Sequence, residues 1–227
     1  MKYEVIFFDA DETLFDFKKS EAFALDKLMD NIDTGYNKEY CIDTYKKINK
    51  KIWEEFEEGL ISSDDLKVER FRRFANEINL VCDAQMLSDM YVKFLGDGSF
   101  LYEETTELLD YLHKKYKISI ITNGLSSVQN RRIRNSVVGH YFDDVVISDE
   151  LKIAKPNPEI FDYALKNLNH DNKSTVLMIG DSLSSDIKGG INANIDTCWF
   201  NPSKKENLSD VSPKFEIHNL LDLKNIL

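Results

Sequence analysis

Carboxylates stand directly after two apolar runs of this 227-residue chain. The first run ends in Asp9 and Asp11, two residues apart, and a later run ends in Asp181, with Asp186 about one helical turn further on. If Asp9, Asp11 and Asp181 converged, they would repel one another strongly unless a cation lay among them. Oxygen ligands without His or Cys favour Mg²⁺. The sequence therefore predicts a magnesium site, provided that the fold brings these residues together.

A second polar segment could bind an anion. Thr122, Asn123 and Gly124 precede Ser126 and Gln129, and the spacing of the last two is that of a capping box at the start of a helix. A hydroxyl beside exposed N–H groups at a helix N-terminus makes an anion site. A turn followed by a capped helix explains the same residues equally well. The segment alone leaves both interpretations open.

A lysine follows the third apolar run. Lys155 precedes a helix that Asn157 is expected to cap, with Pro158 at its first position. Surface lysines are usually solvated, so this residue alone indicates little. Ligands of open parallel sheets, however, bind beyond the carboxyl ends of the strands. Because all four polar segments fall at that end of one expected sheet, a single phosphate site explains the set better than four unrelated turns.

The apolar runs have the spacing of a parallel sheet with crossover helices, and helix-like segments fill the intervals after the second run. The runs are Val5–Phe8, Ile118–Ile121, Val145–Ile147, Val176–Ile179 and Thr197–Phe200. They are continuously hydrophobic rather than alternating, as in strands that are covered on both faces. We therefore expect an α/β fold with a Rossmann-like, doubly wound parallel sheet.

A helical insert is expected after the first strand, because residues 16–98 contain amphipathic stretches and no comparable apolar run. Six aromatic residues in it have helical spacing, which favours a core over base-stacking positions: Trp53, Phe56, Phe71, Phe74, Tyr91 and Phe94. The residues 96–99, Gly-Asp-Gly-Ser, indicate a loop where the chain returns. We expect a catalytic core of residues 1–15 and 99–227 and a helical cap of residues 16–98.

Composition excludes several classes of partner. The net charge is -11 and no basic stripe is present, which disfavours a nucleic-acid polymer but not a small phosphorylated molecule. Cys41, Cys82 and Cys198 are widely spaced without a C-x-x-C pair, so we expect neither a disulfide framework nor a zinc site. No signal-peptide region and no run near ~18 apolar residues is present, so we expect a soluble, cytoplasmic protein without a membrane segment. The oligomeric state is left open.

Taken together, the four segments resemble the four motifs of the haloacid-dehalogenase-like superfamily, in order and over the whole chain. The matching residues are Asp9-x-Asp11-x-Thr13, Thr122, Lys155 and Gly180-Asp181-x4-Asp186. The residues around them, such as Phe7–Phe15 and Ile121–Gly124, resemble the bacterial pyrimidine 5′-nucleotidase branch. Glu12 stands where most relatives have Gly, and Glu at this position is typical of that branch.

The resemblance implies a covalent mechanism. Asp9 would be the nucleophile that forms an aspartyl-phosphate, and Asp11 would protonate the leaving alkoxide and then deprotonate the attacking water. Mg²⁺ would be held by Asp9, Asp181 and the backbone carbonyl of Asp11. The first step needs Asp11 partly protonated near neutral pH, which a neighbouring Asp favours.

The resemblance also implies the binding groups. Thr122, the Asn123 backbone N–H and Lys155 would hold the phosphoryl oxygens. Asp186 would orient Lys155 or a water on the metal. These roles predict a Mg²⁺-dependent phosphomonoesterase that acts on nucleoside 5′-monophosphates, with pyrimidine ones expected from the branch.

Three other functions compete with this prediction. A sugar-phosphate phosphatase or phosphomutase remains an alternative, because the motifs handle only the phosphate. A dehalogenase is disfavoured, because relatives that cleave carbon–halogen bonds usually lack the carboxylate that is present here as Asp11. A catalytically silent regulatory protein is disfavoured, because such proteins commonly lose a motif residue and this chain retains them all.

Overall fold

The computed structural model describes residues 2–227, and for Glu57 and Ser63 it describes the backbone alone. Met1, the first residue of the expected core range, lies outside the described residues. The chain forms two compact units. The first consists of Met1–Phe17 and Ser99–Leu227, and the second consists of Lys18–Gly98.

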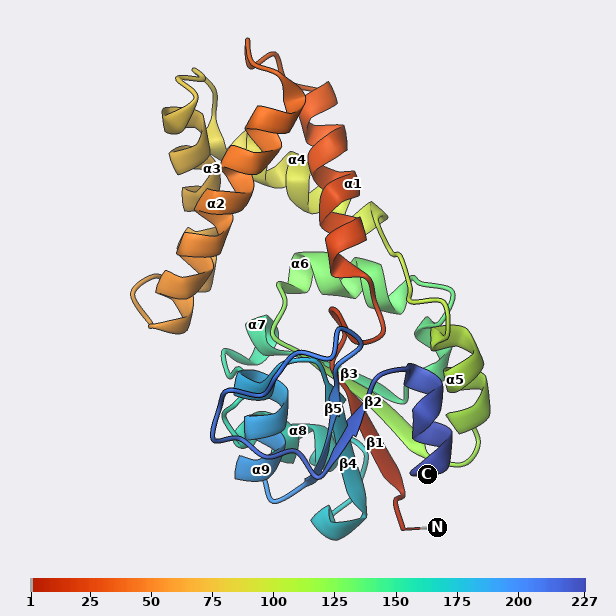
Figure 1. The fold of residues 1–227 in the computed structure, drawn as a ribbon. Helices are drawn as coiled ribbons and strands as arrows, with labels where there is room; N and C mark the ends of the chain where they lie inside the picture. Colours follow the sequence, from red (N-terminus) through yellow and green to blue (C-terminus); the bar gives the residue numbers. More distant parts are fainter. Residues whose placement is uncertain (1) are drawn as a thin grey trace. The chain divides into compact units, whose positions relative to one another are not determined.

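A six-stranded parallel sheet lies at the centre of the first unit (Figure 1). Its strands are β1 (Val5–Phe8), β2 (Lys117–Thr122), β3 (Asp144–Ile147), β4 (Val176–Gly180), β5 (Asp196–Phe200) and β6 (Phe215–Ile217). The predicted α/β class is confirmed, and the five apolar runs are β1 to β5. The sequence did not indicate β6, because three residues with a central Glu216 form no apolar run.

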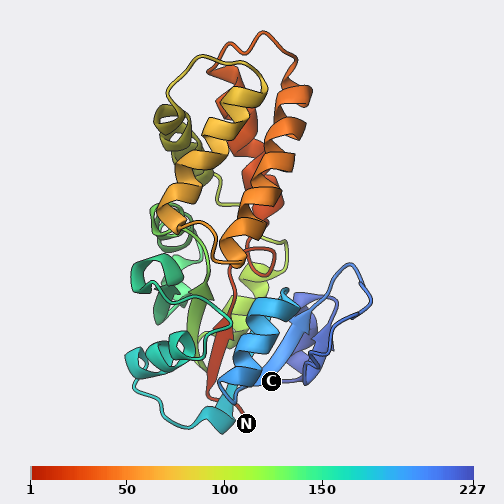
Figure 2. The ribbon, with the colours of Figure 1, turned by 90° about the vertical axis from the view of Figure 1, so that its left-hand side faces the viewer.

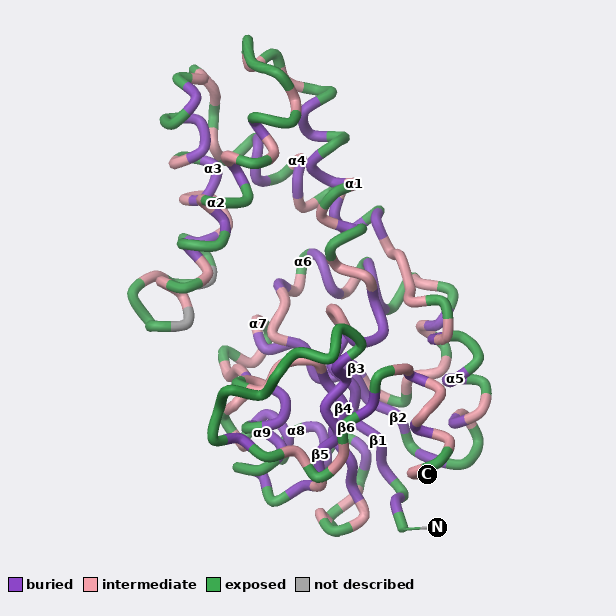
Figure 3. Tube along the Cα trace, viewed as in Figure 1, coloured by how far each residue is buried: buried purple, intermediate pink, exposed green. Residues whose placement is uncertain are grey.

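Both faces of the sheet are covered by helices, as the continuous apolar runs predicted. Ile6 and Phe8 of β1 belong to the core on one face, and Val5 and Phe7 belong to the core on the other. Helix α5 packs on the first face and α8 on the second, and Figure 3 shows β1 and β4 as buried throughout. The sheet is therefore doubly wound.

The remaining elements of the first unit are short. Its helices are α5 (Thr105–Leu112), α6 (Ser126–Gln129), α7 (Ser148–Leu151), α8 (Glu159–Asn167), α9 (Lys188–Asn192), the π-helical turns η1 (Asn130–Arg134) and η4 (Leu183–Ile187), and the 3₁₀ turns η2 (Gly139–Tyr141), η3 (Lys173–Thr175) and η5 (Leu220–Asn225). At the start of α8, Asn157 Oδ1 accepts a hydrogen bond from the Glu159 N–H at 3.0 Å, as predicted. The helix begins at Glu159, however, so Pro158 is its N-cap and not its first residue.

The order of the strands places a topological switch point at the pair β1 and β4. The spatial order is β3-β2-β1-β4-β5-β6, so the chain builds outward from β1 in one direction and then returns to build outward from β4 in the other. The connections diverge at this switch point, and ligands of open α/β sheets bind there. Phe8 pairs with Ile179, so the loops after β1 and β4 begin at the same height.

The second unit is built from helices, and Figure 2 shows α2 and α3 side by side. They are α1 (Phe17–Asp30), α2 (Lys38–Glu57), α3 (Ser63–Glu77) and α4 (Ala84–Asp97). Asn37, Ser62 and Asp83 cap the starts of α2, α3 and α4 with side-chain oxygens. None of the helices in residues 2–227 is long and apolar enough to cross a bilayer.

Two details of the expected insert need correction. The return loop does not begin at Gly96, because α4 continues through Asp97 and ends at its C-cap, Gly98. Of the six aromatic residues expected in the core, only Phe71, Phe74 and Tyr91 are fully buried. The other three are partly exposed, and Trp53 and Phe56 pack edge to face at 5.6 Å between ring centroids.

Candidate active site

A tight loop follows β1 and carries Asp9. The Asp9 N–H donates to Ile179 O at 2.8 Å, which continues the sheet pairing one residue beyond β1. The chain then turns sharply, because Ala10 O accepts a hydrogen bond from the Leu14 N–H at 3.0 Å. Glu12 in this turn has φ 60°, a left-handed conformation that costs a non-glycine residue about 1–2 kcal/mol. The turn leaves the buried Asp9 side chain at the end of the strand.

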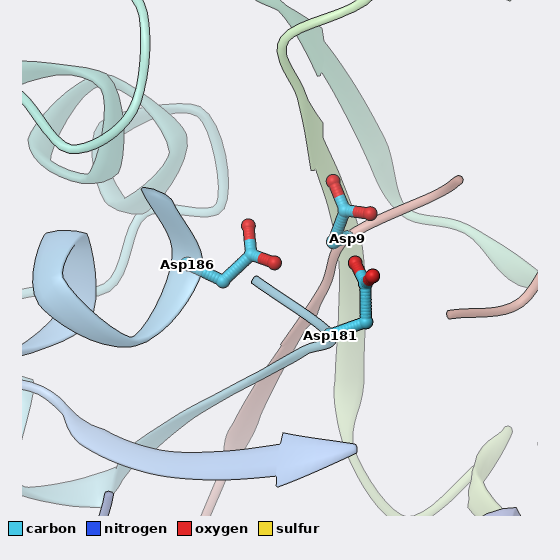
Figure 4. A group of neighbouring side chains, drawn as sticks. All are labelled: Asp9, Asp181 and Asp186. Atoms are coloured by element: carbon cyan, nitrogen blue, oxygen red, sulfur yellow. The ribbon is translucent and has the colours of Figure 1, made fainter. Parts of the chain in front are cut away.

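Three carboxyl groups converge at the switch point. Asp9 follows β1, Asp181 follows β4, and Asp186 lies on η4. Each offers an oxygen, and these oxygens lie within 4.8 Å of one another. Figure 4 shows the three groups directed toward a common point. A set of carboxylate oxygens without sulfur or nitrogen is suited to a hard divalent cation.

The main chain around β4 makes room for Asp186. Gly180 has no Cβ, and a Cβ built there would lie 2.5 Å from Asp186 Cβ, so any larger residue would displace this carboxylate. The Ser182 N–H donates to Asp186 Oδ2 at 3.0 Å. Trp199 Nε1 donates to Asp181 O at 2.8 Å and so holds the backbone at Asp181. The glycine of the fourth motif is therefore a steric requirement of the site.

Lys155 is the cation of this cluster. Its ammonium donates to Asp9 Oδ1 at 2.5 Å, to Asp186 Oδ1 at 2.7 Å and to Ile121 O at 2.6 Å. The residue is 4% exposed, so the prior expectation for a lone lysine, a solvated surface position, does not apply. Burial lowers the pKa of Lys155, but Asp186 and Asp9 outweigh burial, and the pKa is raised above its usual value. The lysine stays charged.

Asn123 holds the segment that carries Lys155. Its Nδ2 donates to Lys155 O at 2.9 Å, and its Oδ1 accepts from the Lys155 N–H at 2.8 Å. This reciprocal pair connects the loop after β2 to the segment before α8. The side chain of Asn123 thus positions the lysine, which leaves only its backbone N–H for the predicted phosphate contact.

The carboxyl groups are crowded enough to resist ionisation. Burial raises the pKa of Asp9 well above its usual range; Lys155 opposes this shift, and Asp186 adds to it. Burial, Asp186 and Glu12 raise the pKa of Asp181 to about 7. One lysine therefore does not balance the acids at neutral pH. A divalent cation would favour their ionised forms, so these residues fit a bound metal ion.

Asp11 lies outside this group of three acids, and its carboxylate bonds to Gln129 and Arg132, to which the sequence analysis gave no role at the site. Gln129 Nε2 donates to Asp11 Oδ2 at 2.6 Å, and Arg132 Nη1 donates to Asp11 Oδ1 at 2.5 Å. The predicted capping box is wrong: α6 has no side-chain cap, and Ser126 bonds to Asp149 instead. Gln129, which the sequence assigned to the capping box, bonds to Asp11 and Thr122 instead.

The predicted residues therefore form two linked groups. Asp9, Lys155, Asp181 and Asp186 are in mutual contact or within ligand distance of one another. Asp11 and Thr122 form the second group, joined by Gln129, whose Nε2 also donates to Thr122 Oγ1 at 3.0 Å.

Comparison with known proteins agrees with this geometry. The family model of the haloacid dehalogenase-like hydrolases matches residues 3–194. Pyrimidine 5′-nucleotidase YjjG of Escherichia coli is 36% identical over 227 residues, which cover 100% of this chain and 99% of the relative. Pyrimidine 5′-nucleotidase PynA of Streptococcus pneumoniae is 34% identical over 233 residues, which cover 100% and 98%.

A solved structure of a related hydrolase also matches this chain over its full length. The HAD-hydrolase YfnB of Bacillus subtilis, crystallised with bound magnesium, superposes with a TM-score of 0.90 at 35% identity. The match covers 100% of this chain and 99% of that chain. With the family model and full-length relatives above 30% identity in agreement, the chain belongs to the haloacid dehalogenase-like hydrolases.

Proposed function

We propose that this hydrolase is a Mg²⁺-dependent phosphomonoesterase that acts on pyrimidine nucleoside 5′-monophosphates through an aspartyl-phosphate. The contact that carries the proposal is the one between the buried Asp9 carboxylate and Lys155 Nζ, beside Asp181 and Asp186. A carboxylate held between a fixed ammonium and a cation site is placed to attack an electrophile that is itself anionic. The names of YjjG and PynA support the nucleotide substrate.

Asp9 and Asp11 divide the hydrolysis into two displacements. In the first, an Asp9 oxygen bonds to phosphorus while the ester P–O bond breaks, and the leaving oxygen takes a proton from Asp11. In the second, water bonds to phosphorus, its proton goes to Asp11, and the bond between Asp9 and phosphorus breaks. Inorganic phosphate leaves, and both carboxyl groups regain their starting states.

Thr122 and Lys155 bind the phosphoryl oxygens. Thr122 Oγ1 accepts hydrogen bonds from the Gly124 N–H at 3.2 Å and from Gln129 Nε2 at 3.0 Å. A hydroxyl has two acceptor sites and one hydrogen, so these contacts direct the O–H outward as a donor. Lys155 supplies the positive charge. The Asn123 backbone N–H is the third proposed donor.

The metal site would consist of carboxylate oxygens of Asp9 and Asp181 with the backbone carbonyl of Asp11. Asp186, which contacts Lys155, is proposed to orient the lysine or a water of the ion. Mg²⁺ would supply charge that stabilises the phosphoryl oxygens during transfer. The helical insert, expected over residues 16–98 and forming the compact unit Lys18–Gly98, is proposed to act as the cap. The cytoplasm is the proposed location.

The test of the function is phosphate release from a panel of nucleoside monophosphates and sugar phosphates, with Mg²⁺ and with EDTA. We expect Mg²⁺-dependent release that is fastest for UMP, dUMP or dTMP. A preference for a sugar phosphate would retain the mechanism and overturn the nucleotidase assignment. No release from any substrate would favour the regulatory alternative and overturn the proposal.

Replacement of Asp11 tests its role as the proton donor. Asp11→Asn should lower kcat for alkyl phosphates by roughly 10²-fold or more, because their leaving groups need protonation. Aryl phosphates should be affected much less, since their leaving groups are better. Rates for paired alkyl and aryl substrates measure the difference, with Asp210→Asn, at an exposed aspartate between β5 and β6, as a control. Equal losses on both substrates would contradict the role.

A further inference from the structure

The Asp11 carboxylate has a separate donor on each of its oxygens. Gln129 Nε2 lies 2.6 Å from Oδ2, and Arg132 Nη1 lies 2.5 Å from Oδ1. Both donor residues are almost completely buried, with exposed fractions of 1% and 0%. Two fixed donors determine the rotation of a carboxylate as well as its position.

The hydrogen bonds also fix which way the Gln129 amide points. Arg132 Nη1 donates to Gln129 Oε1 at 3.2 Å. Because a guanidinium only donates, the amide oxygen must face Arg132, and the amide nitrogen must face Asp11 and Thr122. Gln129 therefore connects the proposed proton donor to a proposed phosphate ligand. A shift of one would be transmitted to the other.

The local backbone is shaped to admit Gln129. A Cβ built on Gly124 would lie 2.6 Å from Gln129 Cγ, so a larger residue in the loop after β2 would displace the amide. Immediately after Gln129 the helix widens into the π-helical turn η1. Such turns are frequent at functional sites, where they redirect side chains.

Arg132 contacts two other segments of the chain, one that contains Phe15 and Phe17 and one that contains Ser99. Its guanidinium carbon lies 5.6 Å from the ring centroid of Phe15 and 5.4 Å from that of Phe17. Its backbone oxygen accepts a hydrogen bond from Ser99 Oγ at 2.7 Å. These residues come from the two places where the chain leaves and re-enters the first unit. The aromatic rings restrict the guanidinium to the orientation that reaches Asp11.

We propose that Gln129 and Arg132 are positioning residues that hold the Asp11 carboxyl in the orientation required for proton transfer. The inference rests on the proposed phosphatase function. Each carboxylate oxygen has two lone-pair sites, so Asp11 can carry a proton on one of them while both donors stay bound. The proton passes from that oxygen to the leaving group, and Asp11 later takes one from water. Gln129 and Arg132 exchange no proton themselves.

The test is Gln129→Met, which preserves length and bulk and removes the donor. We expect kcat for an alkyl phosphate to fall roughly 10- to 100-fold and kcat for an aryl phosphate to fall less than about threefold. Because Gln129 also bonds to Thr122, any rise in KM should be the same for both substrates. Gly124→Ala should give the same pattern through displacement of the amide. In the Asp11→Asn background, Gln129→Met should cause much less than its full loss, because most of its effect acts through Asp11 and only the contact with Thr122 remains to be lost.

Asn130→Ala, on the next residue of the chain, is the matched control; its side chain bonds to Glu150 and not to the site. Equal losses of Gln129→Met on alkyl and aryl substrates, or an additive loss in the Asp11→Asn background, would overturn the inference while the wild-type activity upheld the proposed function. A wild-type enzyme without phosphatase activity would overturn both. A crystal structure of Gln129→Met gives a readout apart from activity: an unmoved Asp11 carboxyl would also count against the proposal.

Discussion

Asp9→Asn is expected to reduce turnover by at least ~10⁴-fold on every phosphate ester, because an amide cannot form the aspartyl-phosphate. The substitution keeps the shape of the side chain, so the loop after β1 and the contacts among Lys155, Asp186 and Ile121 should persist. Inorganic phosphate should therefore still bind. The expected result is an enzyme that recognises phosphate without turning it over.

Single-turnover kinetics and mass spectrometry of the acid-quenched enzyme provide the measurement. The wild type should carry one phosphoryl group on the peptide that contains Asp9, and Asp9→Asn should carry none. Asp162→Asn, an exposed aspartate on α8, controls for the loss of a carboxylate elsewhere. Substantial turnover by Asp9→Asn would exclude the covalent mechanism and leave direct attack by water.

The parts of the site that lie at strand ends could be predicted from sequence. In a parallel sheet with both faces covered, the continuous apolar runs locate the strands, and the residue after each run must lie at the carboxyl edge. Asp9 and Asp181 are such residues. Their approach across the switch point then follows from the pairing of β1 with β4.

Residues that reach the site from within helices could not be predicted in the same way. Gln129 and Arg132 are 118 and 121 positions away from Asp11, and a contact at that separation depends on how α6 and η1 pack. From sequence alone, the spacing of Ser126 and Gln129 was consistent with a capping box, and nothing in it indicated a contact between Gln129 and Asp11. A polar residue on a buried helical face that no cap contact explains would have been the available signal.

The burial of Lys155 could not be predicted from the sequence either. Its burial depends on Asp9, Asp186 and Ile121, which belong to three other segments of the chain. Side-chain type alone predicts a solvated lysine, because ammonium groups are rarely buried without partners. The partners are present here, and they reverse both the expected exposure and the direction of the pKa shift.

Lys155→Met should therefore affect stability and activity together. The substitution leaves the buried carboxylates of Asp9 and Asp186 without their cation, and removal of one partner of a buried ion pair costs about 3–5 kcal/mol in the free energy of unfolding. Loss of a fixed charge on the phosphoryl oxygens should also lower kcat by roughly 10²- to 10³-fold. Urea denaturation and steady-state kinetics measure the two effects separately.

A second substitution distinguishes the two effects. Lys155→Met combined with Asp186→Asn removes one of the uncompensated carboxylates, so the free energy of unfolding should recover in part while kcat stays low. Lys173→Met, at a partly exposed lysine that pairs with Asp162, controls for the loss of a surface charge and should change neither quantity measurably. If activity recovered along with stability, the loss in Lys155→Met would reflect partial unfolding. Recovery of stability with a kcat that stays well below that of Asp186→Asn alone would place Lys155 in the chemistry, because a purely structural lysine could be replaced once its acidic partner was neutralised.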